Sequence, residues 1–471
     1  MQFIQQIIKH FPHAPTASQQ ASIQLFSSFL AAKDTKAVFL LKGYAGTGKT
    51  TLIATWLKSL KPLGYRIVLM APTGRAAKVM STYASSKAYT IHKRIYFAQQ
   101  NKQGAIKFKL QKNKYKKTIF IVDEASMIAD NQQYSKLFEN GSLLNDLIAY
   151  VDGGDDCKLV FVGDTAQLPP VKQELSPALD DIFLENAFQL QVHEAELNEV
   201  VRQSAQSGIL TNATALRHII QSKVEVPFSF DISHTDDVIR MQDGYEIQGA
   251  LEDAYREVGM TETTIVVRSN KRANLYNRQI RTQIMGLENA LAVGDLIMVV
   301  KNNYFWLPVE SSAGFIANGD VLEVLRIHAF KELYGFQFAE VQVRLVDYED
   351  QVPFDTVLVL DTLDSETHAL TAEQSQSLYT QVRQDYAHLP QYKQYLEVKK
   401  NQFFNALQVK FAYAVTCHKA QGGQWKRVFV EQPYLPEGPS IAYYRWLYTA
   451  ITRASDKLFL IGFEEAYFFK D

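Results

Sequence analysis

The stretch GYAGTGKTT at residues 43–51 has the composition and spacing of a phosphate-binding loop. It fits the pattern G-x-x-x-x-G-K-[ST] and lies between the apolar run VFLLK and a helical pattern, which is the context this motif requires. The glycines let backbone N–H groups surround phosphates, Lys49 reaches the β- and γ-phosphates, and Thr50 supplies a hydroxyl to Mg²⁺. The alternative is a glycine-rich turn with a solvated lysine. The predicted nucleotide-binding residues of the loop are Gly43, Gly46, Thr47, Gly48, Lys49, Thr50 and Thr51.

An acidic pair, Asp123 and Glu124, follows a second apolar run, TIFIV. Asp123 is predicted to hold Mg²⁺ together with Thr50, and Glu124 to orient and activate the attacking water. An Asp-Glu pair in isolation is more often a solvated corner, but its place after a strand and downstream of the loop favours catalysis. The sequence thus predicts hydrolysis of ATP, with Mg²⁺ as the cofactor.

A third apolar run ends in polar residues, in the stretch KLVFVGDTAQLPPV at 158–171. At the carboxyl end of a parallel strand such residues face the ligand crevice. Gln167 is then predicted to sense the γ-phosphate or its attacking water, while Asp164 anchors the loop. The residues Pro169 and Pro170 would stiffen the connection to whatever lies beyond, although a simple surface turn remains the alternative.

Two arginines are candidates to neutralise the charge that develops on a transferring phosphoryl group. Arg202 lies in ELNEVVRQS, just after the first α/β block, and Arg453 lies in RWLYTAITRAS near the C-terminus. Taken singly, each could equally be a surface arginine. If they reach across a cleft between domains, hydrolysis becomes linked to closure of that cleft.

Signals for nucleic-acid binding are local. APTGRAAKVMS and VTCHKAQGGQWKRV each follow an apolar run and carry hydroxyl and basic groups at a helix start, which suits phosphates. From Lys93 to Lys117 there are nine Lys or Arg residues, no acidic residue and four aromatic residues, which suits a single strand or a junction. A solvated basic hairpin is the alternative. The residues predicted to contact nucleic acid are Pro72, Thr73, His92, Phe97, Thr416, His418 and Lys419.

The chain alternates strands and helices in two blocks, which predicts an α/β protein with parallel sheets. Between about 291 and 346 the rhythm gives way to β-rich runs separated by Gly, Asn and Asp, which predict a small barrel. Residues 364–400 are polar and predicted to be helical. The strands expected in the α/β blocks are 37–42, 65–71, 118–123, 158–163, 237–241, 264–268, 409–416 and 457–462.

Composition narrows the class of protein. A chain of 471 residues with 47% hydrophobic and 21% charged residues predicts a soluble protein of several domains. The net charge of −1 means that nucleic acid must be bound by local patches. Two cysteines exclude a disulfide framework and a zinc or iron–sulfur site built from cysteine alone. This low cysteine content favours cytoplasmic residence, and no membrane contact is expected because no run approaches the length of a membrane span.

Taken together and in this order, PTASQQA, GYAGTGKTT, APTGRAAK, TIH, VDEASM, VGDTAQLPPV, VVRQS, NGD, TCHKAQG and YTAITRA resemble the motifs of superfamily 1 helicases, in the RecD-like and Dda-like branch. The resemblance covers most of the chain. It implies two RecA-like domains that bind ATP between them, with single-stranded DNA running across both. It also implies 5′-to-3′ movement and activity as a monomer.

The resemblance further implies a division of the chain. The first RecA-like domain with an N-terminal helix would cover 1–200, with a strand-separating pin at about 92–118. The second would cover 201–290 and 408–471, and an SH3-like barrel would lie within 291–407. The helical insertion expected at about 364–400 has no part in the motifs of the family. Gln19 takes the place of an adenine-reading glutamine, Gln167 that of the γ-phosphate sensor, and Arg202 and Arg453 form the arginine pair.

Two other functions remain open from the sequence. One is a nucleic-acid-stimulated ATPase that acts as a clamp or remodelling switch without processive unwinding. The other is a P-loop enzyme for small molecules such as a kinase, although such an enzyme has no use for TCHKAQG or for a second α/β domain.

Overall fold

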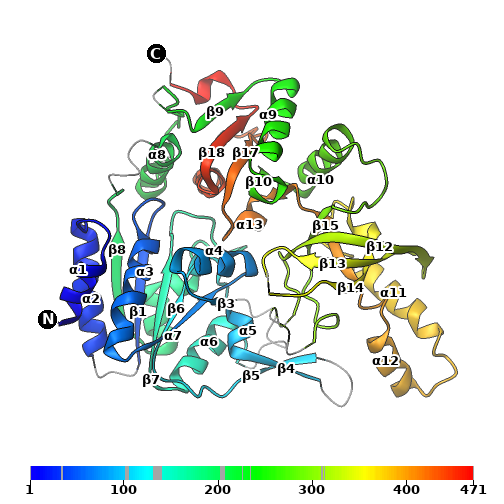
Figure 1. The fold of residues 1–471 in the computed structure, drawn as a ribbon, viewed down its shortest axis with the longest axis horizontal. Helices are drawn as coiled ribbons and strands as arrows, with labels where there is room; N and C mark the ends of the chain where they lie inside the picture. The colour runs from blue at the N-terminus through cyan, green and yellow to red at the C-terminus, as the bar shows by residue number, and fades with distance from the viewer. Residues whose placement is uncertain are drawn as a thin grey trace.

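The computed structural model describes residues 2–32, 36–100, 106–130, 140–201, 207–224, 226–233, 235–308, 311, 313, 315–348 and 350–469. Its β-structure consists of two parallel sheets, a closed barrel and a two-stranded hairpin. In Figure 1 the first sheet lies beside the N-terminal helices, the second sheet lies above it, and the barrel lies at the far side from the N-terminus. The predicted α/β class with an inserted barrel is confirmed.

The first sheet has the strand order β3-β2-β6-β7-β1-β8, with every pair parallel. The four strands predicted for this part of the chain are its four central strands. The edge strands β3 and β8 are only partly buried, so they lack the apolar runs that predict a strand. Its strands are β1 (Ala37–Gly43), β2 (Arg66–Ala71), β3 (Ala88–Thr90), β6 (Lys116–Val122), β7 (Asp155–Gly163) and β8 (Gln191–Leu197).

Helices cover this sheet and fix the start of the phosphate-binding loop. Phe26 of α2 stacks on Trp56 of α3 with ring centroids 4.0 Å apart, and Phe39 of β1 meets both rings edge-on. Such packing holds the beginning of α3 in place relative to the end of β1. The helices of this first domain are α1 (Gln2–His10), α2 (Ala17–Ala31), α3 (Lys49–Leu60), α4 (Gly74–Ala84), α5 (Ile91–Ile95), α6 (Leu143–Asp152) and α7 (Asp181–Phe188).

The second sheet has the order β16-β10-β17-β18-β9, and its pairs are also parallel. We call this sheet and its helices the second domain. Its strands are β9 (Val238–Met241), β10 (Thr263–Val267), β16 (Ala414–Thr416), β17 (Trp425–Glu431) and β18 (Ala454–Ile461). Its helices are α8 (Gly208–Ser222), α9 (Gly244–Glu257), α10 (Asn270–Gln279), α13 (Cys417–Ala420) and α14 (Ile441–Ile451).

Five strands close the barrel: β11 (Leu296–Val299), β12 (Val321–Leu333), β13 (Phe336–Leu345), β14 (Phe354–Val359) and β15 (Leu407–Phe411). The predicted boundary at 407 is wrong, because β15 pairs with β11 and β14. The chain rejoins the second sheet only at β16. The stretch at 409–416 reads as one continuous apolar run, so its pattern cannot show that the chain changes sheets within it.

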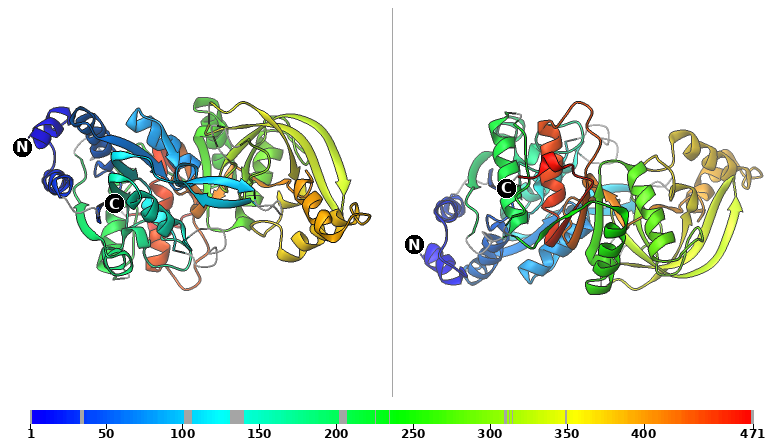
Figure 2. Two further views of the ribbon diagram at one scale, coloured as in Figure 1. Left: turned by 90° about the horizontal axis from the view of Figure 1, so that it is seen from below. Right: turned by 90° about the horizontal axis from the view of Figure 1, so that it is seen from above.

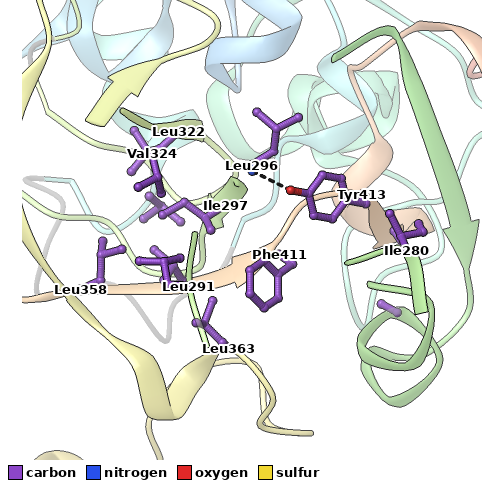
Figure 3. Close-up of a cluster of buried hydrophobic side chains, with 14 of the residues drawn as sticks. Ile280, Leu291, Leu296, Ile297, Leu322, Val324, Leu358, Leu363, Phe411 and Tyr413 are labelled. Carbon is purple, nitrogen blue, oxygen red and sulfur yellow. Dashed lines mark hydrogen bonds between the residues drawn. The ribbon is translucent and has the colours of Figure 1, made fainter. Parts of the chain in front are cut away.

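Figure 3 shows how the barrel is joined to the second domain. Tyr413, which lies between β15 and β16, accepts a hydrogen bond from the Leu296 N–H at 3.1 Å and donates one to Asp295 at 2.9 Å. The Arg281 guanidinium forms a buried bidentate ion pair with the same carboxylate, at 2.9 and 3.0 Å. Phe411, Leu296 and Ile280 lie with Tyr413 in the same apolar cluster (Figure 3). The barrel is therefore firmly attached to the second domain.

The insertion between β14 and β15 forms two helices, α11 (Ala372–Gln384) and α12 (Gln391–Lys400), as its polar pattern predicts. Leu378 and Val382 of α11 and Val398 of α12 pack in one apolar cluster with Phe338 and Val357 of the barrel. The two helices thus extend the barrel away from both parallel sheets (Figure 1).

A hairpin of β4 (Tyr96–Gln100) and β5 (Ile106–Leu110) projects from the first domain toward the barrel (Figure 2). The hairpin base contacts the barrel loop between β11 and β12: Lys93 Nζ donates to the Ser311 carbonyl at 3.2 Å, and the rings of His92 and Phe315 lie 5.9 Å apart. Among the described residues, no helix is both long and apolar enough to cross a membrane.

Candidate nucleotide and nucleic-acid sites

A cleft of about 740 Å³ lies between the two domains. Residues of the phosphate-binding loop, the acidic pair and Gln167 line it from the first domain. Gln424, Lys426 and residues 452–455 line it from the second. Several residues predicted from separate motifs therefore meet in one place, at the carboxyl ends of the first sheet's strands, where ligands bind in open parallel sheets. Those that line the cleft are Gly46, Gly48, Lys49, Thr50, Thr51, Asp123, Glu124, Gln167 and Arg453.

The phosphate-binding loop has the backbone that its glycines permit. Gly46 and Gly48 have φ of 74° and 87°, in the left-handed region, and α3 begins at Lys49. The Lys49 ammonium donates to the carbonyls of Gly43 and Tyr44 at 2.5 and 2.9 Å, so it is held over the loop. Thr47 is fully buried and donates to the Tyr44 carbonyl at 2.8 Å, so its hydroxyl shapes the turn.

The acidic pair lies directly after β6. Asp123 accepts hydrogen bonds from the Tyr83 hydroxyl at 2.6 Å and from the Glu124 N–H at 2.9 Å. Glu124 has φ of 54°, an unfavourable backbone for a residue with a side chain, which turns it into the cleft. Burial raises the pKa of the Glu124 carboxyl, and the Arg453 guanidinium opposes that rise. A carboxylate in such surroundings is a stronger base than an exposed one.

Thr50 and Asp123 are suitable ligands for a magnesium ion. Both line the cleft and both offer oxygen atoms, the ligand type that Mg²⁺ prefers. Among the described residues there is no group of three or more His, Cys, Asp or Glu side chains that could hold a metal. A protein site of one hydroxyl and one carboxylate therefore fits an ion that completes its shell with water and substrate phosphates.

The loop after β7 contacts the second domain through several hydrogen bonds. Gln167 is 6% exposed, and its Oε1 is buried with no partner in the described structure. A buried acceptor beside a cleft is suited to a water or phosphate group there. The Leu168 N–H donates to Thr449 of α14 at 2.8 Å, and its carbonyl accepts from Gln421 at 2.7 Å.

Arg453 reaches the cleft from the second domain. It is 4% exposed and lies 4.0 Å from Glu124. Its guanidinium donates to the carbonyls of Thr449 and Gly423 at 2.9 and 3.2 Å, which fixes its direction. The other predicted arginine, Arg202, lies outside the described residues.

Two residues of α14 have contacts that the sequence did not indicate. The Tyr448 hydroxyl donates to Asp164 at 2.6 Å and accepts from the N–H of Ala45, in the phosphate-binding loop, at 2.9 Å. Arg445 donates to the carbonyl of Thr165 and, at 3.3 Å, to that of Gln167. A tyrosine or an arginine does not by itself indicate a functional site. Only the position of Tyr448 and Arg445 on the helix that leads to Arg453 could have suggested a role.

The surroundings of Gln19 differ from those expected of an adenine-reading glutamine. It is 2% exposed and does not line the cleft. Its Nε2 donates to the Thr47 carbonyl at 3.0 Å, and its Oε1 accepts from the Thr16 N–H at 3.0 Å in a capping box at the start of α2. Both ends of the amide are therefore bonded within the protein, where they support the phosphate-binding loop.

The predicted nucleic-acid contacts fall into two groups. Thr73 caps α4 shortly after β2, and Thr416 is the last residue of β16 and immediately precedes α13, so both lie at strand ends. Gly422, with φ of 74°, approaches so closely that a Cβ there would lie 3.3 Å from Thr73 Oγ1 and 2.9 Å from Ala76 Cβ. The segments 72–76 and 416–422 therefore lie together across the two domains.

Other members of the set flank this group. His418 is exposed, and Lys419 donates to Asn318 of the barrel loop. Burial lowers the pKa of Lys419 to about 8. Phe97 lies on the hairpin with its side chain 39% exposed, opposite Lys109. His92 lies at the hairpin base, where burial lowers its pKa to about 4.

Comparisons with known proteins agree with this arrangement. The model of an AAA domain matches residues 19–226, and that of a UvrD-like helicase C-terminal domain matches residues 411–461. The ATP-dependent RecD2 DNA helicase of Deinococcus radiodurans is 24% identical over 91% of this chain and 47% of its own length. The ATP-dependent DNA helicase dda of Enterobacteria phage T4 is 23% identical over 92% of this chain and 96% of its own length.

Among solved structures, a Pif1 helicase from Bacteroides in complex with ADP-AlF3 and ssDNA is 13% identical, with a TM-score of 0.46 over 98% of this chain and 95% of that one. This chain spans about half the length of RecD2 and nearly all of the phage protein. The family models and these relatives confirm the predicted class, a superfamily 1 helicase. Its relatives within that class include the RecD2 and dda helicases.

Proposed function

We propose that this protein is an ATP-dependent DNA helicase that moves 5′ to 3′ along single-stranded DNA and unwinds duplex ahead of it. The observation that carries the proposal is the 4.0 Å approach of Arg453 to Glu124 across the cleft. An arginine from one domain facing the catalytic carboxylate of the other makes hydrolysis depend on how the two domains are placed.

The residues of the cleft have distinct roles in hydrolysis. Lys49 neutralises charge on the β- and γ-phosphates, and Thr50 and Asp123 hold Mg²⁺, which when bound neutralises further charge on those oxygens. Water attacks the γ-phosphorus, its proton passes to Glu124, and the bond to the β-phosphate oxygen breaks. Arg453 stabilises the charge that develops, and Gln167 contacts the water or the γ-phosphate with its buried amide.

The substrate is supported by the relatives, two of which are named as DNA helicases, and by the position of the hairpin, while the direction is carried over from the resemblance of the motifs. Segments 72–76 and 416–422 offer hydroxyl, backbone and basic groups from both domains to one strand. The hairpin presents the exposed Phe97 to the side of them, where it can stack on the last unpaired base. Monomeric activity is consistent with a cleft completed by residues of a single chain.

The test compares unwinding of duplexes that carry a 5′ or a 3′ single-stranded tail, with RNA-tailed duplexes as controls. Unwinding of the 5′-tailed DNA substrate alone is expected. Preference for the 3′ tail would refute the direction. Lys49→Ala should abolish both unwinding and DNA-stimulated hydrolysis, since it removes the phosphate's main counter-charge, and stimulated hydrolysis retained by this variant would refute the ATPase assignment.

A further inference from the structure

A second groove, of about 720 Å³, lies between the barrel and the helical insertion, away from the nucleotide cleft. Three segments form it: residues 301–305 after β11, α11 with the residues just before it, and the end of α12 with the start of β15. None of the residues assigned above lines it.

Aromatic side chains line this groove. Phe305 is 38% exposed, although a large apolar side chain is normally buried. Tyr379 of α11 and Phe404 are half-buried, with ring centroids 6.0 Å apart and an angle of 67° between the rings. Rings that are fixed on one side and open on the other form a platform on which unpaired bases stack, whatever their sequence.

Two lysines and no acidic residue also line the groove. Burial, and then the charge of Lys301, lowers the pKa of Lys399. The Lys399 ammonium lies 5.2 Å from the centre of the Phe404 ring. Within the described structure, no carboxylate forms an ion pair with either lysine. Two adjacent ammonium groups without a counter-ion favour an anionic ligand such as a phosphate backbone.

The groove lies near the predicted DNA contacts. A small pocket next to it is lined by Val300, His368, Lys410, Thr416 and Lys419. The groove itself is lined by the neighbouring residues on the same three segments, Lys301, Leu370 and Gln408. On β15, Gln408 and Lys410 are two residues apart and so point to the same side of the strand. The two pockets are therefore built from neighbouring residues of the same segments, which places Lys301 and Lys399 near the contacts at Thr416 and Lys419.

We propose that this groove binds the single-stranded DNA that extends beyond the contacts at Thr416 and Lys419, with phosphates at Lys301 and Lys399 and bases stacked on Phe305 and Phe404. The proposal rests on the function proposed above and adds a second contact region to it. Single-stranded DNA is the occupant because the stacking surfaces need unpaired bases, and because the lysines continue the charge of Lys410 and Lys419.

The test measures binding of the full chain to oligonucleotides of increasing length by fluorescence anisotropy, for the double variant Lys301→Ala with Lys399→Ala and for Phe305→Ala. For long oligonucleotides the double variant should lower the slope of log affinity against log salt by about 1.4, from about 0.7 for each of two phosphates. Phe305→Ala should weaken binding on the order of tenfold, as expected for one lost stacking contact. The variants should bind like the wild type when the oligonucleotide is so short that it occupies only the contacts at Thr416 and Lys419.

Matched controls lie on α12. Lys400→Ala removes a neighbouring lysine that pairs with Glu397, and Tyr392→Ala removes an aromatic side chain that is 65% exposed outside the groove. Neither should change the affinity. A 4-thiothymidine oligonucleotide should also crosslink to residues 301–305 or 404 in the wild-type chain.

The outcomes separate the two proposals. If no single-stranded DNA binds and none stimulates hydrolysis, the proposed function itself fails. If DNA binds and stimulates but the groove variants match the wild type at every length, only the groove proposal is overturned. Equal weakening of blunt duplex binding would also overturn it, because stacking would then not be the contact.

Discussion

The hydroxyl of Tyr448 connects α14 to both the phosphate-binding loop and the loop that carries Gln167. It lies on α14 of the second domain, donates to Asp164 in the loop that carries Gln167, and accepts from the Ala45 N–H in the phosphate-binding loop. Tyr448 is 1% exposed, and its burial and the Asp164 carboxylate raise the pKa of its hydroxyl well above the usual value, so it stays protonated. The replacement Tyr448→Phe removes only this oxygen and keeps the ring.

The size of the effect follows from the two bonds. A hydrogen bond to a charged group contributes about 1.5–3 kcal/mol, and a buried N–H left without a partner costs about 1–3 kcal/mol. Tyr448→Phe should thus weaken the contact between the domains by about 3 kcal/mol, which is roughly 100-fold in the equilibrium between closed and open cleft. DNA-stimulated hydrolysis needs the closed cleft, so its kcat should fall by a factor of about 10 to 100.

The assay is steady-state ATP hydrolysis at saturating single-stranded DNA, with thermal unfolding measured in parallel. Tyr443→Phe is the matched control, because Tyr443 lies on the same helix, is equally buried and donates at 2.6 Å to Gln432 within the second domain. It should lower thermal stability while leaving DNA stimulation nearly intact. Wild-type stimulation in Tyr448→Phe, or an equal loss of stimulation in both variants, would refute the role of this hydroxyl.

Three further predictions concern the sensor loop, the hairpin and the DNA contacts. Gln167→Ala should leave some hydrolysis but little unwinding, because the sensing amide is lost; if the two rates fall in equal proportion, the sensor role is refuted. Phe97→Ala should reduce unwinding several-fold but spare translocation, measured by streptavidin displacement from single-stranded DNA, since the exposed ring supports strand separation and little of the fold. Affinity for single-stranded DNA should fall as pH rises from 7 to 9, because burial lowers the pKa of Lys419 to about 8 and the ammonium is lost above it. Lys419→Arg, which stays charged, should reduce that fall, and the remainder comes from Lys410, whose pKa burial also lowers to about 8; the same pH profile in both proteins would contradict the assignment.

Local motifs could be predicted from the sequence, whereas contacts between domains could not. Asp123 directly follows β6, and Gln167 and Lys49 lie in the short loops that begin where β7 and β1 end, so their place near a strand end is fixed by the few residues around them. The barrel was recognised, but β15 was not assigned to it, because an apolar run does not show which sheet it joins. The hydroxyl of Tyr448 bonds to Asp164 and Ala45, which lie about 280 and 400 positions away along the chain. No local pattern in the sequence can indicate contacts over such separations.

The same helix also explains why the nucleotide and the DNA would act on each other. On α14, Arg445, Tyr448 and Thr449 are three and four residues apart and so share a face, and all three bind the phosphate-binding loop or the sensor loop. The short helix α13, which precedes β17 in the chain, is attached to α14 by the bond from Cys417 Sγ to the Trp446 carbonyl at 3.5 Å. Thr416 lies one residue before that bond.

Because the bond between Cys417 and Trp446 lies within the second domain, Arg453, Thr416 and Lys419 move as one body when the cleft opens. The barrel belongs to the same body, since Tyr413 and the buried pair of Arg281 and Asp295 attach it to the second domain. The groove at Lys301 and Lys399 is then displaced by the same movement that withdraws Arg453 from Glu124. An advance of the second domain on release of the nucleotide would therefore carry two adjacent stretches of bound strand, and a longer bound stretch makes loss of the DNA during each step slower.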